Sequence, residues 1–148
     1  MLAQTTAINL TEARASEAGV TWVSKQQLFE QADILTVHLV LSPRSQGLVD
    51  AQALGWMKPT ALLINTSRGP IVDEQALIDA LQHQRLAGAA LDVFAQEPLP
   101  ADHPLRSLPN LLATPHIGYV TQNNYRQFFE HMIEDVLAWH ASTPIRLL

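Results

Sequence analysis

The chain has 148 residues, a length at which a single domain is the expectation. Apolar residues make up 47% of it and charged residues only 16%, which excludes a disordered chain and a collagen-like fibre. Nine Lys and Arg residues stand against 14 Asp and Glu residues, so no basic stripe is available to bind nucleic acid. There is no cysteine, hence no disulfide or thiolate metal site, and no apolar run is long enough to cross a bilayer. We therefore expect a cytoplasmic protein with neither a nucleic-acid nor a membrane partner.

Helix and strand patterns alternate from residue 24 onwards. Ser24 followed by Gln27 is a capping box, which predicts a helix that begins there and ends near Asp33. Short apolar runs rich in β-branched residues follow, and their unbroken hydrophobicity is typical of strands covered on both faces in a parallel sheet. The predicted strands are 34–40, 61–66, 86–93 and 111–114, with predicted helices at 50–57 and 73–83.

A long amphipathic helix is predicted after the last of these strands. Its apolar residues alternate between spacings of three and one, so they share one face that must be covered. They are Tyr125, Phe128, Phe129, Met132, Ile133, Val136 and Leu137. The alternating pattern predicts an open α/β sheet with right-handed crossovers. Ligands of such sheets bind beyond the carboxyl ends of the strands, so we expect a site in the loops after Val40, Thr66, Val93 and Thr114.

The segment NTSRGP (65–70) follows one of these buried strands and places an arginine at its carboxyl end. The guanidinium of Arg68 has parallel N–H donors that match the two oxygens of a carboxylate, whereas a lysine would supply charge without orientation. Arg68 is therefore a candidate for binding an acidic substrate. The alternative is a structural arginine on a turn, paired with a nearby acid.

A glutamate and a histidine occupy the two longer loops that follow predicted strands. Glu97 lies in FAQEPLP and His116, 19 residues later, in TPHIGYVT. Histidine titrates near neutral pH, and a neighbouring carboxylate fixes its tautomer, as a proton donor and acceptor requires. The alternative is that His116 is packed or solvated without a chemical role, as a histidine chosen blindly usually is. The chain has five other histidines, which are His38, His83, His103, His131 and His140.

Other site types find no support in the spacing of these residues. The sequence contains no HExxH metal motif, so we expect no metal site, and no GxSxG elbow of a serine hydrolase. It also lacks the GxxxxGK[ST] loop of nucleotide triphosphate binding and the GxGxxG loop that would cradle a dinucleotide.

Four blocks of the sequence, taken together, closely resemble the NAD-dependent D-isomer-specific 2-hydroxyacid dehydrogenases. The blocks are ADILTVHLVLSPRSQGLVD (32–50), ALLINTSRGPIVDEQALIDAL (61–81), LAGAALDVFAQEPLP (86–100) and LPNLLATPHIGYVT (108–121). They occur in the family's order and cover most of the chain. The resemblance implies a Rossmann-like fold and hydride transfer between a nicotinamide cofactor and a small 2-hydroxy or 2-oxo acid.

The resemblance also implies roles for individual residues. Arg68 would bind the carboxylate of the substrate, His116 would exchange the proton of its hydroxyl group, and Glu97 would keep His116 protonated and oriented. The implied cofactor contacts are Val40, Thr66, Ser67, Arg68, Asp92, His116 and Gly118, with Asp92 expected at the nicotinamide carboxamide. Val40 stands where many members of the family have proline.

The sequence departs from the family in length. Members are usually more than twice as long, and the N-terminal substrate domain and the first strand and helix, which carry GxGxxG, have no counterpart here. We therefore expect residues 1–148 to form a single partial dinucleotide-binding domain. Its fold would be a truncated, doubly wound Rossmann-like α/β fold with a mainly parallel sheet and a long C-terminal helix. The chain would begin within the second strand.

These departures predict how the chain binds its cofactor and assembles. Ala7, in TAINL (6–10), stands near the position of the acid that usually holds the adenosine ribose, so NAD is expected but NADP is not excluded. Without that acid and the glycine loop, cofactor binding should be weak or absent. The first Rossmann strand is central, so its loss should leave two half-sheets, and a homodimer with strand or helix exchange would cover them. The function expected is that of an oxidoreductase fragment; the alternative is a catalytically inactive NAD-binding or oligomerising module.

Overall fold

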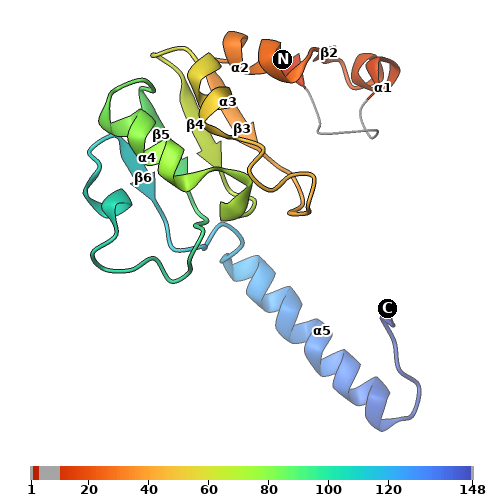
Figure 1. The fold of residues 1–148 in the computed structure, drawn as a ribbon. Helices are drawn as coiled ribbons and strands as arrows, with labels where there is room; N and C mark the ends of the chain where they lie inside the picture. The colour runs from red at the N-terminus through yellow and green to blue at the C-terminus, as the bar shows by residue number, and fades with distance from the viewer. Residues whose placement is uncertain (1, 4–10, 148) are drawn as a thin grey trace. The chain divides into compact units, whose positions relative to one another are not determined.

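The structure is a computed structural model that describes residues 2–3 and 11–147 (Figure 1). It divides into two compact units, Met1–His116 and Ile117–Leu148, which are described separately. The elements of the first unit are β1 (Leu2–Ala3), α1 (Glu12–Glu17), β2 (Thr21–Trp22), α2 (Lys25–Gln31), β3 (Ile34–Val37), α3 (Ala51–Trp56), β4 (Leu62–Asn65), the 3₁₀ helix η1 (Gly69–Ile71), α4 (Glu74–Gln82), β5 (Gly88–Leu91), the 3₁₀ helix η2 (Pro104–Ser107) and β6 (Leu111–Ala113). The second unit contains α5 (Gln122–His140).

The described strands form two separate parallel sheets. One has the order β3-β4-β5-β6, and its register places Leu63 beside Leu35 on one side and Ala89 on the other. The other consists of β1 and β2 alone, with Leu2 beside Thr21. The prediction of two half-sheets is thus confirmed for the described residues. The predicted strand segment Thr6–Leu10, which includes Ala7, lies outside them.

The helices of the first unit begin where side-chain caps predict them. Ser24 accepts a hydrogen bond from the Gln27 N–H at 3.2 Å, and Gln27 accepts one from the Ser24 N–H at 3.1 Å, which confirms the capping box. Asp50 and Asp73 cap α3 and α4 by accepting from the Ala53 and Ala76 N–H groups, without a reciprocal bond from a side chain. The predicted helices at 50–57 and 73–83 are therefore confirmed to within one residue at each end.

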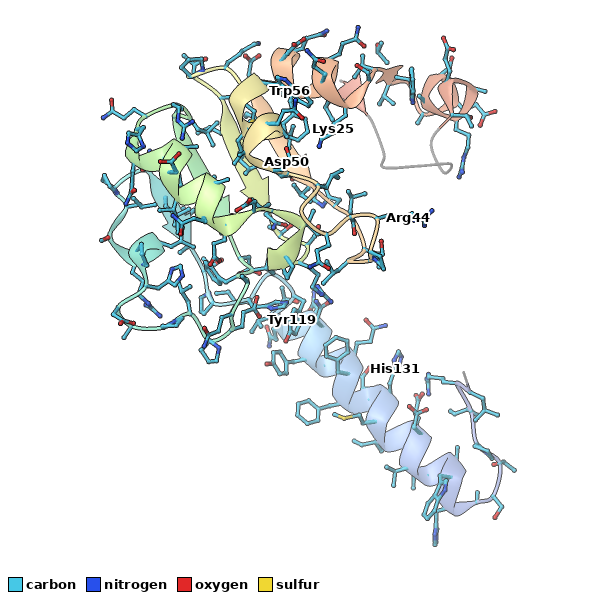
Figure 2. All side chains as sticks on the ribbon, viewed as in Figure 1. Lys25, Arg44, Asp50, Trp56, Tyr119 and His131 are labelled. Carbon is cyan, nitrogen blue, oxygen red and sulfur yellow. The ribbon has the colours of Figure 1, made fainter. Side chains whose placement is uncertain are left out.

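Helices α2 and α3 are joined by an aromatic and cationic contact (Figure 2). The rings of Phe29 and Trp56 meet edge to face with their centroids 6.4 Å apart. The ammonium group of Lys25 lies 5.8 Å from the centre of the Trp56 ring and 3.9 Å from a carboxylate oxygen of Asp50. These contacts anchor the entry of the chain into the four-stranded sheet.

Within the described ranges, residues cover one face of the four-stranded sheet and leave the other bare. Leu35 and Leu63 are buried in a single hydrophobic cluster that also contains Leu54 of α3 and Leu77 of α4. On the opposite face Ile34 is 62% exposed and Leu112 67% exposed. Strands buried on both faces were predicted from their unbroken hydrophobicity, and this prediction is wrong for the described part of the chain. The apolar residues of the bare face have no covering element there.

Strand β3 is shorter than predicted because the Ser67 side chain, in place of a neighbouring strand, binds the backbone at its carboxyl end. The Ser67 hydroxyl donates to the Val37 carbonyl at 2.6 Å and accepts from the Leu39 N–H at 3.2 Å. Ladder pairing with β4 therefore ends at Val37, and residues 38–40, predicted as strand, form a loop. This exchange ties the loop after β3 to the loop after β4, where the candidate site lies.

Helix α5 confirms the predicted long helix but not the expected cover for its apolar face. Thr121 caps it by accepting from the Asn124 N–H at 3.2 Å, and it continues to His140. Its seven apolar positions, from Tyr125 to Leu137, are between 46% and 64% exposed, and the described part of the chain buries none of its residues. Figure 2 shows side chains projecting all along the helix, with His131 labelled.

Candidate active site

The loop that carries Arg68 is folded by the buried side chain of Asn65. The Asn65 carboxamide accepts from the Ser67 N–H at 3.0 Å and donates to the Arg68 carbonyl at 3.0 Å. An Asn that satisfies the backbone two and three residues ahead builds a tight turn at the end of β4. The turn leaves Arg68 exposed, with its guanidinium donating to the Ser67 carbonyl at 2.6 Å.

Gly69 allows this loop to pack directly against the loop after β5. A Cβ atom at Gly69 would lie 2.0 Å from the carbonyl carbon and oxygen of Phe94 and 2.6 Å from the Ala95 nitrogen. These are backbone atoms that no side-chain rotation can move away. Only a glycine permits this approach, which brings the Arg68 loop alongside the segment that leads to Glu97.

Glu97 and His116 meet directly, as the sequence predicts. The His116 Nδ1 lies 2.6 Å from the Glu97 Oε2, and the other carboxylate oxygen accepts from the Phe94 N–H at 2.9 Å. His116 adopts a left-handed backbone conformation with φ of 57°, a geometry that few non-glycine residues take up. With Nδ1 engaged by a carboxylate, Nε2 is the ring nitrogen that can exchange a proton with a bound molecule.

The pKa of the Glu97 carboxyl lies below its ordinary value of 4.5. Partial burial on its own would raise this pKa, but it is outweighed by hydrogen bonds from His116 and the Phe94 N–H and by the positive charges of His116 and Arg68. Glu97 is therefore an anion at neutral pH. Arg68 is the last-named of these influences on Glu97, and the position of its guanidinium relative to His116 stays a prediction.

The predicted cofactor residues lie at the carboxyl ends of successive strands. Asp92 follows β5 and is buried, and its carboxylate accepts from the Thr114 hydroxyl at 2.5 Å. Thr66 and Ser67 follow β4, whereas Val40 follows β3 and is 86% exposed. Gly118 belongs to the second unit, so its proximity to the others stays a prediction.

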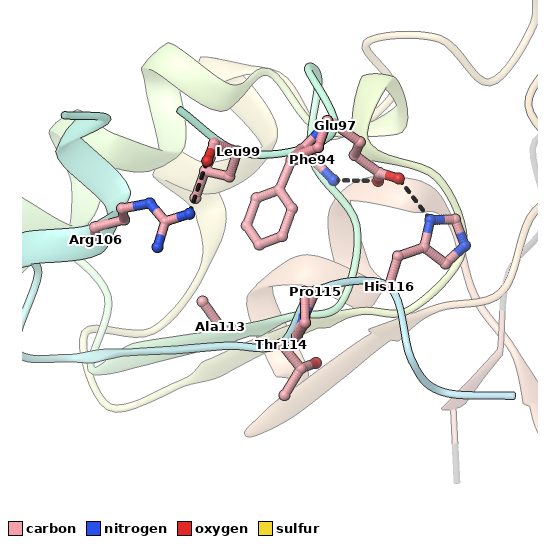
Figure 3. Close-up of a pocket in the computed structure, with 9 residues that line it drawn as sticks. Phe94, Glu97, Leu99, Arg106, Ala113, Thr114, Pro115 and His116 are labelled. Atoms are coloured by element: carbon pink, nitrogen blue, oxygen red, sulfur yellow. Dashed lines mark hydrogen bonds and ion pairs between the residues drawn. The ribbon is translucent and has the colours of Figure 1, made fainter. Parts of the chain in front are cut away.

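A pocket of about 540 Å³ opens beside the Glu97–His116 pair (Figure 3). Glu97 and His116 lie at one end of it and Arg106 at the other, with the Phe94 ring between them. Arg106 donates to the Leu99 and Pro100 carbonyls at 2.7 Å, so it braces the loop that forms the pocket wall. Of the predicted site residues only Glu97 and His116 line this pocket, so it does not contain the whole expected cofactor site.

The described residues offer no alternative site of the metal-binding or membrane-spanning kind. In residues 2–3 and 11–147 no group of three or more His, Asp or Glu side chains could hold a metal ion. No helix in the same ranges combines the length and apolar character needed to cross a membrane. Three of the other histidines bind to neighbouring side chains: His38 to Thr36, His83 to Asp79 and His103 to Glu74.

The low pKa of Glu97 makes the stability of the chain depend on pH. Because folding lowers this pKa, the carboxylate stabilises the fold above 4.5, and that contribution is lost as pH falls through the folded-state value. Glu97→Gln should therefore lower the urea midpoint of unfolding at neutral pH, and its difference from the wild type should shrink in acid. Glu130→Gln on α5 is the matched control. A difference that is constant across this range would contradict the assignment.

Comparison with known proteins gives the family. The family described as "D-isomer specific 2-hydroxyacid dehydrogenase, NAD binding domain" matches residues 2–118. This chain belongs to the D-isomer specific 2-hydroxyacid dehydrogenases. The resemblance noted in the sequence is thereby confirmed, and with it a nicotinamide dinucleotide as the class of cofactor for which the domain is built.

Individual relatives of the chain are named as oxidoreductases. It is 43% identical over 131 residues to a D-3-phosphoglycerate dehydrogenase of Synechocystis sp., covering 86% of this chain and 24% of the relative. It is 40% identical over 127 residues to a glyoxylate/hydroxypyruvate reductase B of Yersinia enterocolitica, covering 86% and 39%. The chain thus spans between a quarter and two fifths of the length of these relatives.

A solved structure of the same family confirms the Rossmann-like α/β fold class. It comes from Ralstonia solanacearum and is described as a D-3-phosphoglycerate dehydrogenase. It matches with a TM-score of 0.83 at 39% identity, over 88% of this chain and 39% of that one. The arrangement of strands and helices in this chain is therefore similar to that of this solved relative.

Sequence reasoning missed the residues that shape the site rather than act in it. Asn65 could have been found, since an Asn placed two residues before a turn position is a recognised turn signal. The role of Gly69 could not have been found, because the backbone that packs against it belongs to Phe94, 25 residues later in the sequence.

Proposed function

We propose that this chain supplies the acid–base and cofactor-binding part of an oxidoreductase that interconverts a small D-2-hydroxy acid and its 2-oxo acid with NAD(H). In this proposal residues 1–148 are a single partial dinucleotide-binding domain, and the substrate domain is not part of it. The observation that carries the proposal is the 2.6 Å contact between Glu97 and the His116 ring. A cytoplasmic location is part of the same proposal.

Each of the three residues has a distinct task. Arg68 binds the carboxylate of a 2-oxo acid through two parallel N–H donors and fixes its orientation. His116 then delivers a proton from Nε2 to the carbonyl oxygen as the hydride reaches the carbonyl carbon, which yields the hydroxyl group of the product. Glu97 stabilises the protonated ring before transfer and keeps Nδ1–H directed away from the substrate. In the reverse direction neutral His116 accepts the hydroxyl proton.

The residues present fit the nicotinamide half of the cofactor better than the phosphate half. Asp92 is buried at the carboxyl end of β5, and a carboxylate is the kind of group that accepts from the N–H of a carboxamide. When bound, the cofactor supplies or accepts the hydride. The sequence contains no glycine loop to hold the pyrophosphate.

The activity can be tested directly with the substrates named for a relative. The purified chain is mixed with NADH and either glyoxylate or hydroxypyruvate, and the loss of NADH absorbance is followed. Turnover above the rate without protein is expected, with lower turnover for Arg68→Lys, which keeps the charge but loses the two-point contact. If turnover is absent at all protein concentrations, the catalytic proposal for this chain is wrong.

A non-catalytic binding or oligomerising module is the second candidate. It is favoured by the exposed apolar face of α5. The same assay separates the two candidates, because the module would bind partner or cofactor without oxidising NADH.

Cofactor binding is predicted to be weak. The pyrophosphate of a dinucleotide normally binds the N–H groups of a glycine loop at a helix N-terminus, and the sequence lacks this loop. Isothermal titration calorimetry with NADH should give a dissociation constant in the micromolar range or weaker, and a parallel titration with NADPH compares the two cofactors. A sub-micromolar constant for either would show that another element holds the phosphates.

The chain is predicted to form a homodimer. The bare face of the four-stranded sheet and the apolar face of α5 both expose large side chains, and a symmetric partner can cover them. Sedimentation velocity at micromolar concentration should report about twice 16.3 kDa, and Ile133→Glu on α5 should reduce this mass toward that of one chain. A wild-type chain that sediments as a folded monomer would contradict the prediction.

A further inference from the structure

A second glutamate–histidine pair lies behind the candidate active site. Glu74, the first residue of α4, places its Oε1 3.3 Å from the Nε2 of His103, the residue that caps η2. Both side chains are about one fifth exposed, at 21% and 20%. Neither residue has a task in the proton transfer described above.

The hydrogen bonds of His103 define which ring nitrogen carries its proton. Its Nδ1 accepts from the Leu105 N–H at 3.3 Å, so this nitrogen is unprotonated. The proton of the neutral ring therefore lies on Nε2, and Nε2–H donates to Glu74. His103 thus directs one carboxylate oxygen of Glu74 and leaves the other available.

That other oxygen binds the backbone beside the active site. Glu74 Oε2 accepts from the Ala95 N–H at 3.1 Å, and the preceding N–H, that of Phe94, donates to Glu97 at 2.9 Å. Two successive peptide N–H groups are thus bound by two different glutamates. The same two residues are those against which Gly69 packs.

We propose that Glu74 and His103 are positioning residues that hold the Phe94–Ala95 backbone, so that the Phe94 N–H binds Glu97 and directs it toward His116. The importance of this alignment for catalysis rests on the proposed function. The alignment itself is a property of the folded chain, independent of cofactor and substrate.

Glu74→Gln tests the proposal. His103 and Ala95 bind different oxygens of Glu74, and glutamine replaces one of these oxygens by an NH2 group that cannot accept, so one of the two bonds is lost. The pKa of Glu97, measured by ¹³C carboxyl NMR titration, should rise toward 4.5, and the His116 Nδ1–H signal should change. The direction of the change in the pKa of Glu97 separates two effects. Removal of the nearby negative charge of Glu74 would by itself lower this pKa, so a rise reports loss of the hydrogen bond from the Phe94 N–H. Asp102→Asn, which removes an exposed charge beside His103, is the control and should not raise it.

Variants of the histidine complete the test. His103→Leu removes the donor to Glu74 and should raise the pKa of Glu97 in the same direction, whereas His103→Gln can restore an N–H donor and should return it toward the wild-type value. Glu74→Asp keeps the charge but shortens the reach to Ala95, so it provides the same readout if Glu74→Gln does not fold. Circular dichroism confirms folding of each variant.

An unchanged or lowered pKa of Glu97 in folded Glu74→Gln and Glu74→Asp chains would overturn the proposal. The measurement needs neither cofactor nor substrate, so it is separate from the NADH assay. A chain that shows the NMR effect but no turnover would refute the proposed function and leave the positioning pair intact. Turnover without the NMR effect would support the proposed function and overturn the positioning role of Glu74 and His103.

Discussion

Gly69→Ala is expected to lower the free energy of unfolding by about 3 kcal/mol, at the upper end of the usual cost of overpacking. The added methyl group would lie 2.0 Å from backbone atoms of Phe94, so one of the two loops must move as a unit. Moving the Phe94 segment would also weaken its bond to Glu97, so the loss of stability should be accompanied by a higher pKa of Glu97. Urea unfolding followed by circular dichroism measures the first effect, and carboxyl NMR measures the second.

Gly55→Ala is the matched control for this substitution. Gly55 lies within α3, and an added Cβ there meets no atom within 4 Å. Alanine is favoured over glycine in a helix by up to about 1 kcal/mol, so this variant should be as stable as the wild type or more stable. If Gly69→Ala and Gly55→Ala have the same stability, the close approach of the two loops does not exist in solution.

His116→Gln is expected to reduce the rate of NADH-dependent reduction of a 2-oxo acid by about 10²- to 10⁴-fold, the usual contribution of a general acid. Glutamine can donate a hydrogen bond to the carbonyl oxygen but cannot release a proton at neutral pH. Substrate binding should change little, because the carboxylate is bound by Arg68, so the loss should appear in kcat rather than in KM. Steady-state kinetics across a range of pH measures both.

His131→Gln on α5 makes the same chemical change in the second unit and should leave the rate unaltered. The pH dependence provides a further check. The limb of the wild-type profile that reports the histidine should be missing in His116→Gln. A variant that retains the wild-type rate and profile would assign the proton transfer to another group.

The sequence predicted elements whose signals are local. Ser24 with Gln27 marked the start of α2, and Asp50 and Asp73 stand at the caps of α3 and α4. The parallel four-stranded sheet followed from alternating apolar runs and amphipathic segments, because neighbouring strands are the default when helices connect them. The contact of Glu97 with His116 followed from the family resemblance together with their position after adjacent strands.

Features that depend on distant residues were not predictable in this way. Unbroken hydrophobicity shows that a strand can be covered on both faces, but which element covers Ile34 or Leu112 depends on other parts of the fold. The short helix α1, capped by Thr11, went unnoticed because it has too few apolar residues to show a period. The bond from Glu74 to Ala95 joins residues 21 positions apart, and no spacing in the sequence indicates it.

In the described part of the chain, the outer edge of β3 is where a further parallel strand could pair. In the described residues β3 pairs with β4 on one side only, so a row of backbone N–H and C=O groups faces outward. A peptide that joins this edge by β-augmentation in the parallel direction would end beside the loop of Val40 and Ser67. A synthetic peptide could combine such a strand with a glycine-rich turn at its carboxyl end. Backbone pairing with β3 would then place the N–H groups of that turn, which can bind an anion, beside the candidate active site.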